Sequence, residues 1–332
     1  MESLQACNTN YYEQVKQDLE TPGLLPATHT VQIKGMPSPL WPWQRGGHQW
    51  FANLMFDPKG KGSKDEALKA RTAINLTGTT LYERKTIRIE TGSKSLNVDV
   101  ILMTRPGAIP NHRWTLTCFG IRALAAKRIA EGCEENPDGG PLQRLMSECG
   151  TNIAAYDYPG MGANETDSIS LENCVNAHNG IVAFVQQEKQ PEQLVLYGHS
   201  VGAYIISEAK KVSLPTIPSI SVFDRAARRT TDILWLDGFI PYFFGTTLGW
   251  DIAIDPSQER TIFMTNAQTE QDALFEPGDS LVPTDTAMKT EANLAWYALT
   301  FLKKEVIGHN GWHDCTCQHW RVLSECLERA FK

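Results

Sequence analysis

The sequence lacks the patterns that mark membrane and nucleic-acid proteins. No run of apolar residues approaches the roughly 18 that a membrane-spanning helix needs. Lysine and arginine form no stripe, and 31 basic against 38 acidic residues give a net charge of −7, so nucleic acid is not an expected partner. The first residues show no basic segment followed by an apolar run. We therefore expect a cytoplasmic protein, or one exported into a host cell without such a signal.

Cysteine is scarce for a protein built on disulfides. The 332 residues contain eight cysteines, and a chain of this length without a secretory pattern is expected to keep them as reduced thiols. The cysteines are Cys7, Cys118, Cys133, Cys149, Cys174, Cys315, Cys317 and Cys326. With 42% hydrophobic residues, the chain is long enough for one large domain with its own core and an extension.

Short apolar runs alternate with helical patterns through most of the chain. Residues 86–90 and 96–103 indicate an antiparallel pair around Thr91-Gly92. The later runs predict buried strands at 114–119, 152–156, 194–197, 233–236, 261–264 and 301–307. Helical patterns, among them 121–130 and 287–299, separate these strands, and the Pro- and Ser-rich segment 213–221 is interpreted as a linker. The sequence therefore predicts an α/β fold with a mostly parallel sheet and helices on both faces.

Residues 1–83 do not share this alternation. They predict an N-terminal extension that packs on the core, which then spans 84–332. A helix at Tyr11–Leu19 and an edge strand at Thr30–Ile33 are expected in it. Trp41, Trp43 and Trp50 lie close together in the sequence, and we expect them to pack the extension onto the main domain.

The stretch Gln193–Ala209, QLVLYGHSVGAYIISEA, predicts a strand, a sharp turn and a helix with Ser200 at the apex. Gly198 and Gly202 flank a place where backbone segments approach too closely for a Cβ atom. The serine is then held in a strained turn with its hydroxyl exposed. The following helix directs its N–H groups and the positive end of its dipole at the same point.

The Gly-His-Ser-Val-Gly sequence in this context resembles the nucleophile turn of α/β-hydrolase-fold serine hydrolases, and the resemblance covers roughly Lys85–Lys332. A narrower resemblance rests on Tyr156–Gly162, YDYPGMG, together with Tyr197–Gly202. These two blocks are similar to uncharacterised α/β-hydrolases of intracellular bacterial pathogens, namely chlamydial and Legionella effector-like proteins. The resemblance implies a Ser-His-Asp triad, with the acid and then the histidine following the serine along the chain.

The resemblance places the acid just after a late strand. Asp272 follows the strand predicted at 261–264, and Ala273–Pro277 is similar to the family's acid loop. Asp237 is the alternative, because it ends the strand predicted at 233–236 and some family members carry the acid there. Glu270 and Asp279 are further carboxylates of the same loop.

The base is expected in the loop after the last strand, because a serine hydroxyl needs a histidine to take its proton. His309 follows the strand predicted at 301–307, and His313 lies four residues later. Both remain candidates, with His309 preferred. His199, beside the serine, is interpreted as a structural residue.

Two backbone N–H groups are needed where negative charge develops on the substrate. Val201, directly after the serine, is the first candidate. The second is Ile121, after the strand predicted at 114–119, with Arg122 as an alternative. Phe119-Gly120 stands where the family more often has His-Gly, which makes the second donor the open question.

A zinc site is the competing interpretation of the C-terminal histidines. Five residues of zinc-binding type lie within a short stretch: His309, His313, Cys315, Cys317 and His319. Their spacing is not that of a standard zinc finger, so we expect catalysis by histidine and no metal or cofactor. A cysteine nucleophile is not favoured either, because no cysteine lies in a comparable turn.

The predicted activity is hydrolysis of a carboxylic ester, a thioester or a lipid acyl bond, with a small-molecule or lipid ester as substrate. The aromatic segment Gly238–Trp250 is too irregular in sequence for a core helix. It lies within a candidate cap at 238–258 and would receive an acyl chain. Two alternatives stay open: an acyltransferase with the same triad, and a non-catalytic binding or effector module on the same fold. The sequence does not determine the oligomeric state.

Overall fold

The structure is a computed structural model of the 332-residue chain. It describes residues 2–37, 40–76, 78–92, 94–105, 112–131, 141–164, 167–224, 230, 239–254, 261–264 and 317–332. Within these residues no helix is both long and apolar enough to cross a bilayer.

The core of the structure is an eight-stranded sheet with the order β1-β2-β3-β5-β4-β6-β7-β8. Only β3 runs antiparallel to its neighbours among these strands. The strands are β1 Ala27–Gln32, β2 Leu81–Glu90, β3 Ser95–Thr104, β4 Arg113–Cys118, β5 Asn152–Tyr156, β6 Gln193–His199, β7 Ser219–Asp224 and β8 Thr261–Met264. The central strands are covered on both faces, and every residue of β4 and β5 is buried.

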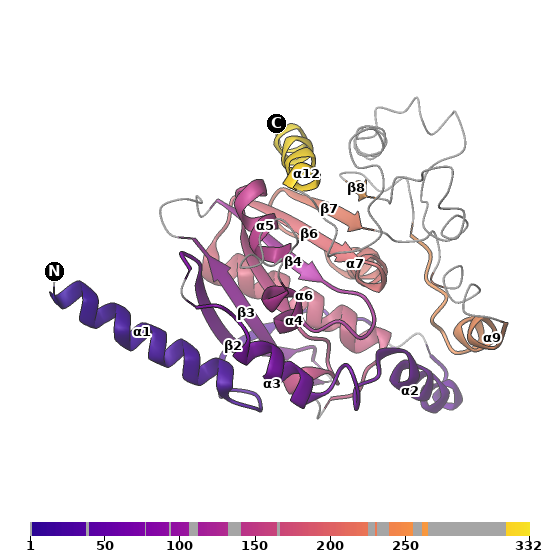
Figure 1. Cartoon of the computed structure of the whole chain (residues 1–332). Helices are drawn as coiled ribbons and strands as arrows, with labels where there is room; N and C mark the ends of the chain where they lie inside the picture. Colours follow the sequence, from indigo (N-terminus) through magenta and orange to yellow (C-terminus); the bar gives the residue numbers. More distant parts are fainter. Residues whose placement is uncertain are drawn as a thin grey trace, which may run out of the picture.

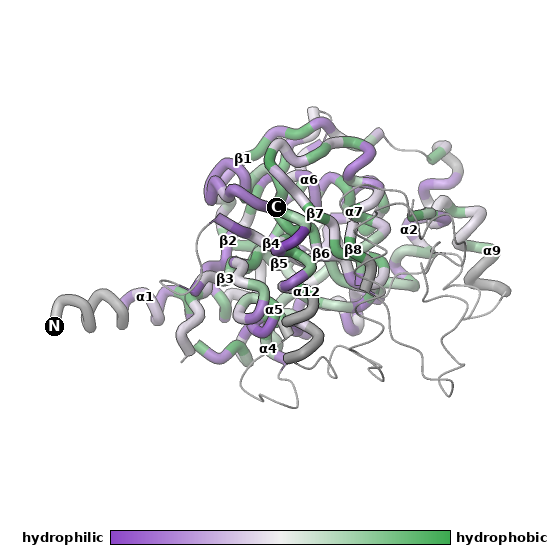
Figure 2. The backbone as a smooth tube through the Cα atoms, turned by 90° about the horizontal axis from the view of Figure 1, so that it is seen from above, coloured by the Kyte–Doolittle hydropathy of each residue, from purple (hydrophilic) through white to green (hydrophobic). Residues whose placement is uncertain are grey.

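Helices cover both faces of the sheet (Figure 1). Helices α6 (Leu171–Lys189) and α7 (Val201–Val212) pack on one face, with the larger apolar cluster beneath them. Four helices contribute to the cluster on the other face: α1 Glu2–Glu20, α4 Ala125–Ala130, α5 Pro141–Cys149 and α12 Cys317–Ala330. Figure 2 shows β4, β5 and β6 in the interior of the molecule. The predicted α/β fold, a mostly parallel sheet with helices on both faces, is confirmed.

The first part of the chain supplies more than the predicted helix and edge strand. β1 pairs in parallel with β2 and forms the edge of the sheet. The helix α2, Pro42–Phe56, lies beside α9, Phe239–Thr247 (Figures 1 and 2). Phe51 and Phe56 of α2 are fully buried in the core, so residues distant in sequence meet at this side. The domain boundary at residue 83 stays a prediction.

The tryptophans pack less than the sequence predicts. Trp41 is 68% exposed and Trp50 is 53% exposed, although the Trp50 ring meets Phe244 edge to face at 5.4 Å. The prediction is therefore wrong for Trp41, and the side chain of Trp43 lies outside the described residues. The phenylalanines of α2 anchor this segment instead.

A buried charged cluster joins the start of the chain to the sheet. We call it the Arg–Asp cluster: Arg71 of α3 (Lys64–Thr72), Arg84 of β2 and Asp99 of β3. Arg84 Nε lies 2.9 Å and Arg71 Nη1 3.4 Å from the Asp99 carboxylate. The remaining guanidinium donors bind backbone carbonyls at the end of α1, including that of Thr21 at 3.0 Å from Arg71 and 2.8 Å from Arg84. All three side chains are at most 3% exposed.

Two segments differ from the sequence prediction. The segment 213–221 was expected to be a linker, but Ser219–Asp224 forms β7 between β6 and β8. A helix was expected at 121–130, but α4 begins only at Ala125 because Arg122 adopts a left-handed φ of 60°. The Asp157 carboxylate accepts the Ala125 N–H at 2.7 Å, so a residue distant in sequence caps this helix.

The aromatic segment 238–250 was expected to be irregular, yet it contains the helix α9. His48 of α2 bonds the Leu248 carbonyl, just after the end of α9, through Nδ1 (2.6 Å). Its Nε2 accepts the Leu171 N–H at the start of α6 (3.2 Å). The role of 238–258 as a cap stays a prediction. The elements expected at 233–236, 287–299 and 301–307 lie outside the described residues.

Candidate active site

Ser200 lies at the junction of β6 and α7, in the turn that the sequence predicts. Its φ of 53° and ψ of −121° are values that a residue with a side chain rarely adopts. The Ser200 N–H donates to the Asp224 carbonyl at 2.9 Å, and the Ser200 carbonyl accepts the Ala203 N–H at 3.0 Å. The side chain is partly exposed. Backbone bonds on both sides therefore hold the hydroxyl at the carboxyl end of the sheet.

The two glycines of the turn have the predicted steric role. A Cβ atom on Gly198 would lie 2.6 Å from the backbone nitrogen of Ala203. One on Gly202 would overlap the backbone carbonyl of Cys118, at the end of the neighbouring strand β4. Both positions require glycine, because backbone atoms cannot yield as a flexible side chain can. This close packing brings the start of α7 directly against the end of β4.

The loop after β4 passes beside the serine. A Cβ on Gly120 would lie 3.2 Å from Ser200 Cβ and 3.5 Å from Ser200 Oγ. Ile121 follows and is partly buried. Arg122 then turns outward, and its guanidinium donates to the carbonyls of Met55 (3.1 Å) and Leu54 (3.3 Å) at the end of α2. The loop that carries the second predicted oxyanion donor is thus fixed to a helix from the start of the chain.

Val201, the first predicted donor, opens α7. Its N–H belongs to the first turn of the helix, whose amides have no acceptor within the helix, and the positive end of the dipole lies at the same place. Val201 and the loop at Gly120 both adjoin Ser200, and the role of their N–H groups as oxyanion donors stays a prediction.

The predicted acid and base candidates lie outside the described residues. These are Asp237, Asp272, His309 and His313. Among the residues of the zinc interpretation, only Cys317 and His319 belong to a described element, at the start of α12, and their side chains are not described. No group of three or more potential ligands that could hold a metal occurs within the described part of the chain.

Asp224 is a carboxylate near the serine that sequence reasoning missed. It ends β7, pairs with His199 in the sheet register, and is 1% exposed. The Tyr197 hydroxyl donates to its Oδ2 at 2.6 Å. β7 pairs directly with β8, so Asp224 ends the strand that lies beside β8 in the sheet. The apolar run before Asp224 was the available signal, but its two serines made it resemble a linker.

The described cysteines offer no competing nucleophile. Cys118, Cys149, Cys174 and Cys326 are free and buried. Burial raises the pKa of the Cys118 thiol to about 11, and it raises the pKa of Cys149 and Cys174 further. These thiols remain protonated near neutral pH, and a protonated thiol is a poor nucleophile.

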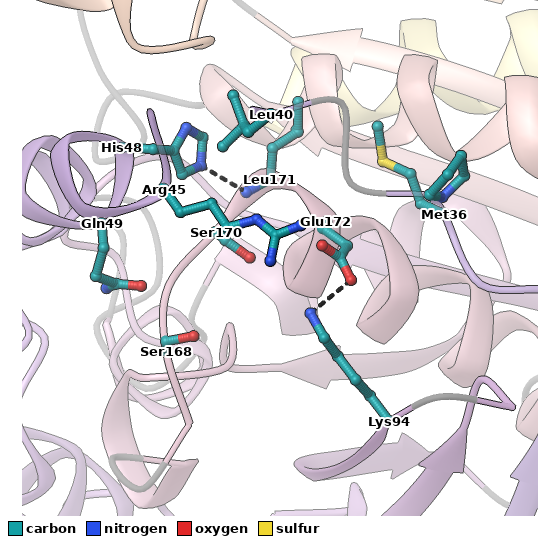
Figure 3. A pocket seen from close by; sticks show the side chains of 11 residues that line it. Met36, Leu40, Arg45, His48, Gln49, Lys94, Ser168, Ser170, Leu171 and Glu172 are labelled. Atoms are coloured by element: carbon teal, nitrogen blue, oxygen red, sulfur yellow. Dashed lines mark hydrogen bonds and ion pairs between the residues drawn. The ribbon is translucent and has the colours of Figure 1, made fainter. Parts of the chain in front are cut away.

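A cavity of about 350 Å³ opens between α2, the segment before it and the start of α6 (Figure 3). Its lining mixes apolar with charged side chains, and two of these, Lys94 and Glu172, form an ion pair at 2.6 Å. Burial lowers the pKa of His48 in this wall, and both of its ring nitrogens are hydrogen-bonded. Ser200 is not among the residues that line the cavity.

Comparison with known proteins places the chain in a family. The sequence profile of the family described as Chlamydia CHLPS protein (DUF818) matches residues 66–304, which is most of the chain. The chain belongs to this family. The CHLPS match agrees with the chlamydial part of the resemblance drawn from residues 156–162 and 197–202, while a role as an effector stays a prediction. A search of curated proteins finds no match.

Solved structures similar to this CHLPS-family chain include esterases from three organisms. An esterase of Pyrococcus furiosus has 14% identity and a TM-score of 0.36, and the match covers 55% of this chain and 70% of that one. An esterase of Rhizomucor miehei has 15% identity and a TM-score of 0.36, covering 58% and 59%.

Carboxyl esterase 2 of Tuber melanosporum has 13% identity and a TM-score of 0.34, covering 55% and 58%. The chain thus spans less than two thirds of the length of the two fungal enzymes. At these scores the likeness says nothing about the substrate of this chain.

Proposed function

We propose that the protein is a serine hydrolase that cleaves a carboxylic ester, a thioester or a lipid acyl bond. Ser200 Oγ forms a bond to the acyl carbon while His309 takes its proton and returns it to the leaving oxygen or sulfur. Asp272 orients His309, and the N–H groups of Val201 and Ile121 bind the oxyanion. Water then cleaves the acyl-enzyme through the same histidine. No metal or cofactor takes part.

One observation carries this proposal: Ser200 combines a left-handed φ of 53° with close approach by the loop after β4. An unfavourable backbone conformation costs on the order of 1–3 kcal/mol and persists where the surrounding structure enforces it. The glycines at 198 and 202 enforce it here. A turn that served only to connect a strand to a helix would need neither the strain nor a serine.

The test is labelling with a fluorophosphonate probe, which reacts with activated serines. Wild type and Ser213→Ala, which changes an exposed serine at the end of α7, should both be labelled. Ser200→Ala should not be. Labelling that persists in Ser200→Ala, or no labelling of folded wild type, would contradict the proposal and favour a binding module.

The same assay assigns the partners of the serine. His309→Ala should abolish labelling and ester hydrolysis, whereas His313→Ala should retain them. Among the carboxylates, Asp272→Ala is expected to lower the rate by about 10⁴-fold, with Asp237→Ala and Asp224→Asn as the two comparisons.

Product analysis with an added alcohol or amine distinguishes a hydrolase from an acyltransferase, since only the latter would form a new ester or amide in preference to the free acid.

A further inference from the structure

Four buried side chains form a neutral hydrogen-bonded network beneath the serine turn. We call it the tyrosine network: Cys118 of β4, Tyr156 of β5, Tyr158 after β5, and His178 of α6. Cys118 Sγ lies 3.1 Å from Tyr156 Oη and 3.2 Å from Tyr158 Oη. Tyr156 Oη lies 3.0 Å from His178 Nδ1. All four are at most 2% exposed, so their geometry is set by packing.

The network ends on the loop beside Ser200. The Tyr158 hydroxyl donates to the Phe119 carbonyl, which can only accept. Tyr158 Oη is then free to accept from the Cys118 thiol, Cys118 Sγ from the Tyr156 hydroxyl, and Tyr156 Oη from His178 Nδ1–H. This assignment lets every group donate in the same direction. It leaves one bare acceptor, His178 Nε2, which has no hydrogen-bond partner in the described structure, and buried acceptors tolerate this better than N–H donors.

Each group of the network stays neutral at physiological pH. Burial lowers the pKa of His178 to about 4 and raises the pKa of Tyr156 and Tyr158 well above the usual range. The network therefore supplies no charge and no proton to a reaction. It supplies instead a fixed hydroxyl, that of Tyr158, which holds the orientation of the Phe119 carbonyl.

Two peptide groups next to the nucleophile have fixed orientations, the first through Tyr158 and the second through a backbone bond. In a trans peptide the N–H points away from the C=O of the same unit. Holding the Phe119 carbonyl with Tyr158 therefore sets the orientation of the Gly120 N–H. The Gly120 carbonyl accepts the Ala123 N–H at 3.4 Å, which sets the orientation of the Ile121 N–H. Gly120 itself lies against Ser200.

We propose that Tyr158 is a positioning residue that aims the backbone N–H groups of the loop after Phe119 at the oxyanion formed on the Ser200-bound substrate. The inference rests on the proposed hydrolase activity. Tyr158 does not touch the substrate. It acts through the Phe119 carbonyl.

The experiment compares Tyr158→Phe with Tyr156→Phe, using p-nitrophenyl acetate as substrate. Each variant removes one buried hydroxyl of the network, and each of these hydroxyls hydrogen-bonds Cys118 Sγ. Only the Tyr158 hydroxyl bonds the loop. We expect similar losses of thermal stability, but kcat lowered about 10- to 100-fold in Tyr158→Phe alone, with KM within about twofold of wild type.

A second readout uses the matching thionoester, in which sulfur replaces the carbonyl oxygen. Sulfur accepts hydrogen bonds weakly, so an enzyme with well-aimed donors prefers the ester strongly. This preference should fall in Tyr158→Phe and persist in Tyr156→Phe. Because the preference is a ratio of two rates on one sample, it does not depend on how much of a variant folds.

Equal kcat values or equal ester preferences in the two variants would overturn the positioning role, as would a Tyr158→Phe effect confined to KM. Ser200→Ala is measured in parallel. If it retained turnover, the proposed hydrolase function would fail at Ser200 itself. If it lost turnover while the two tyrosine variants behaved alike, only the role of Tyr158 would fail.

Discussion

The Arg–Asp cluster and the tyrosine network are both buried and polar, yet they differ in charge and in what they hold. In the Arg–Asp cluster two guanidinium groups share one carboxylate, and their other donors bind carbonyls at the end of α1. The tyrosine network is neutral and ends on the Phe119 carbonyl. The first fixes one part of the chain to another, whereas the second orients a single peptide beside Ser200. The charged groups thus attach α1 to the sheet, and the neutral Tyr158 hydroxyl aligns the peptide after Phe119.

The largest expected effect comes from breaking the charged side of this comparison. Asp99→Ala leaves the guanidinium groups of Arg71 and Arg84 buried without a counter-charge, which should cost about 3–5 kcal/mol of unfolding free energy. Arg88→Ala, on the same strand as Arg84, breaks an exposed pair with Glu90 and should cost less than about 1 kcal/mol. Urea denaturation measures both. A loss in Asp99→Ala as small as that in Arg88→Ala would show that the cluster does not stabilise the fold.

The dependence of stability on pH tests whether His178 of the tyrosine network is held neutral. Burial lowers the pKa of His178 from 6.5 to about 4, so the unfolded chain binds more protons than the folded chain between these values. Its contribution to stability is therefore complete above pH 6.5 and is lost as pH falls toward 4, by on the order of 3 kcal/mol.

Wild type should lose this increment relative to His178→Leu in denaturation curves recorded across that range. Burial raises the pKa of Asp157 to about 6, which acts in the opposite direction. Asp157 is present in both proteins, so its contribution cancels in the difference. A difference that stays constant with pH would mean that His178 is not held neutral by burial.

A smaller effect on stability is expected where the loop meets the serine. Gly120→Ala places a Cβ 3.2 Å from Ser200 Cβ without touching the tyrosine network. The neighbour must move by a few tenths of an ångström, so we expect kcat to fall about tenfold and unfolding free energy to change by at most about 1 kcal/mol. Gly46→Ala, where a Cβ meets nothing within 4 Å, is the control and should leave kcat unchanged. Equal kcat in both variants would show that this approach does not affect the reaction.

Local patterns predicted the elements whose apolar runs have clear limits. The strands at 152–156 and 261–264 have the predicted bounds. β7 was missed because its two serines resemble a linker, whereas in the fold it pairs with β6 and β8 and the buried Ser221 hydroxyl accepts from Lys210 Nζ at 3.2 Å. The helix α2 was missed because Gly46 and Gly47 resemble a turn, whereas Gly47 makes room for Leu248.

The candidate site was predictable in part for the same reason. Ser200 and its glycines form a local motif, so their turn could be predicted from sequence. The tyrosine network could not be, because no spacing links Tyr158 with the carbonyl of Phe119, 39 residues earlier. The acid and the base stay predictions.

The family match and the folded structure do not begin at the same residue. The match starts at 66, inside α3. Yet Arg71 and Arg84 bind carbonyls of residues 18–23, and β1 covers the outer edge of β2. Separated from that segment, the matched region would expose an unpaired strand edge and buried guanidinium donors without acceptors. The region by which the chain is identified is therefore smaller than the region that must fold together, and a fragment cut to the limits of the match would not be an autonomous unit.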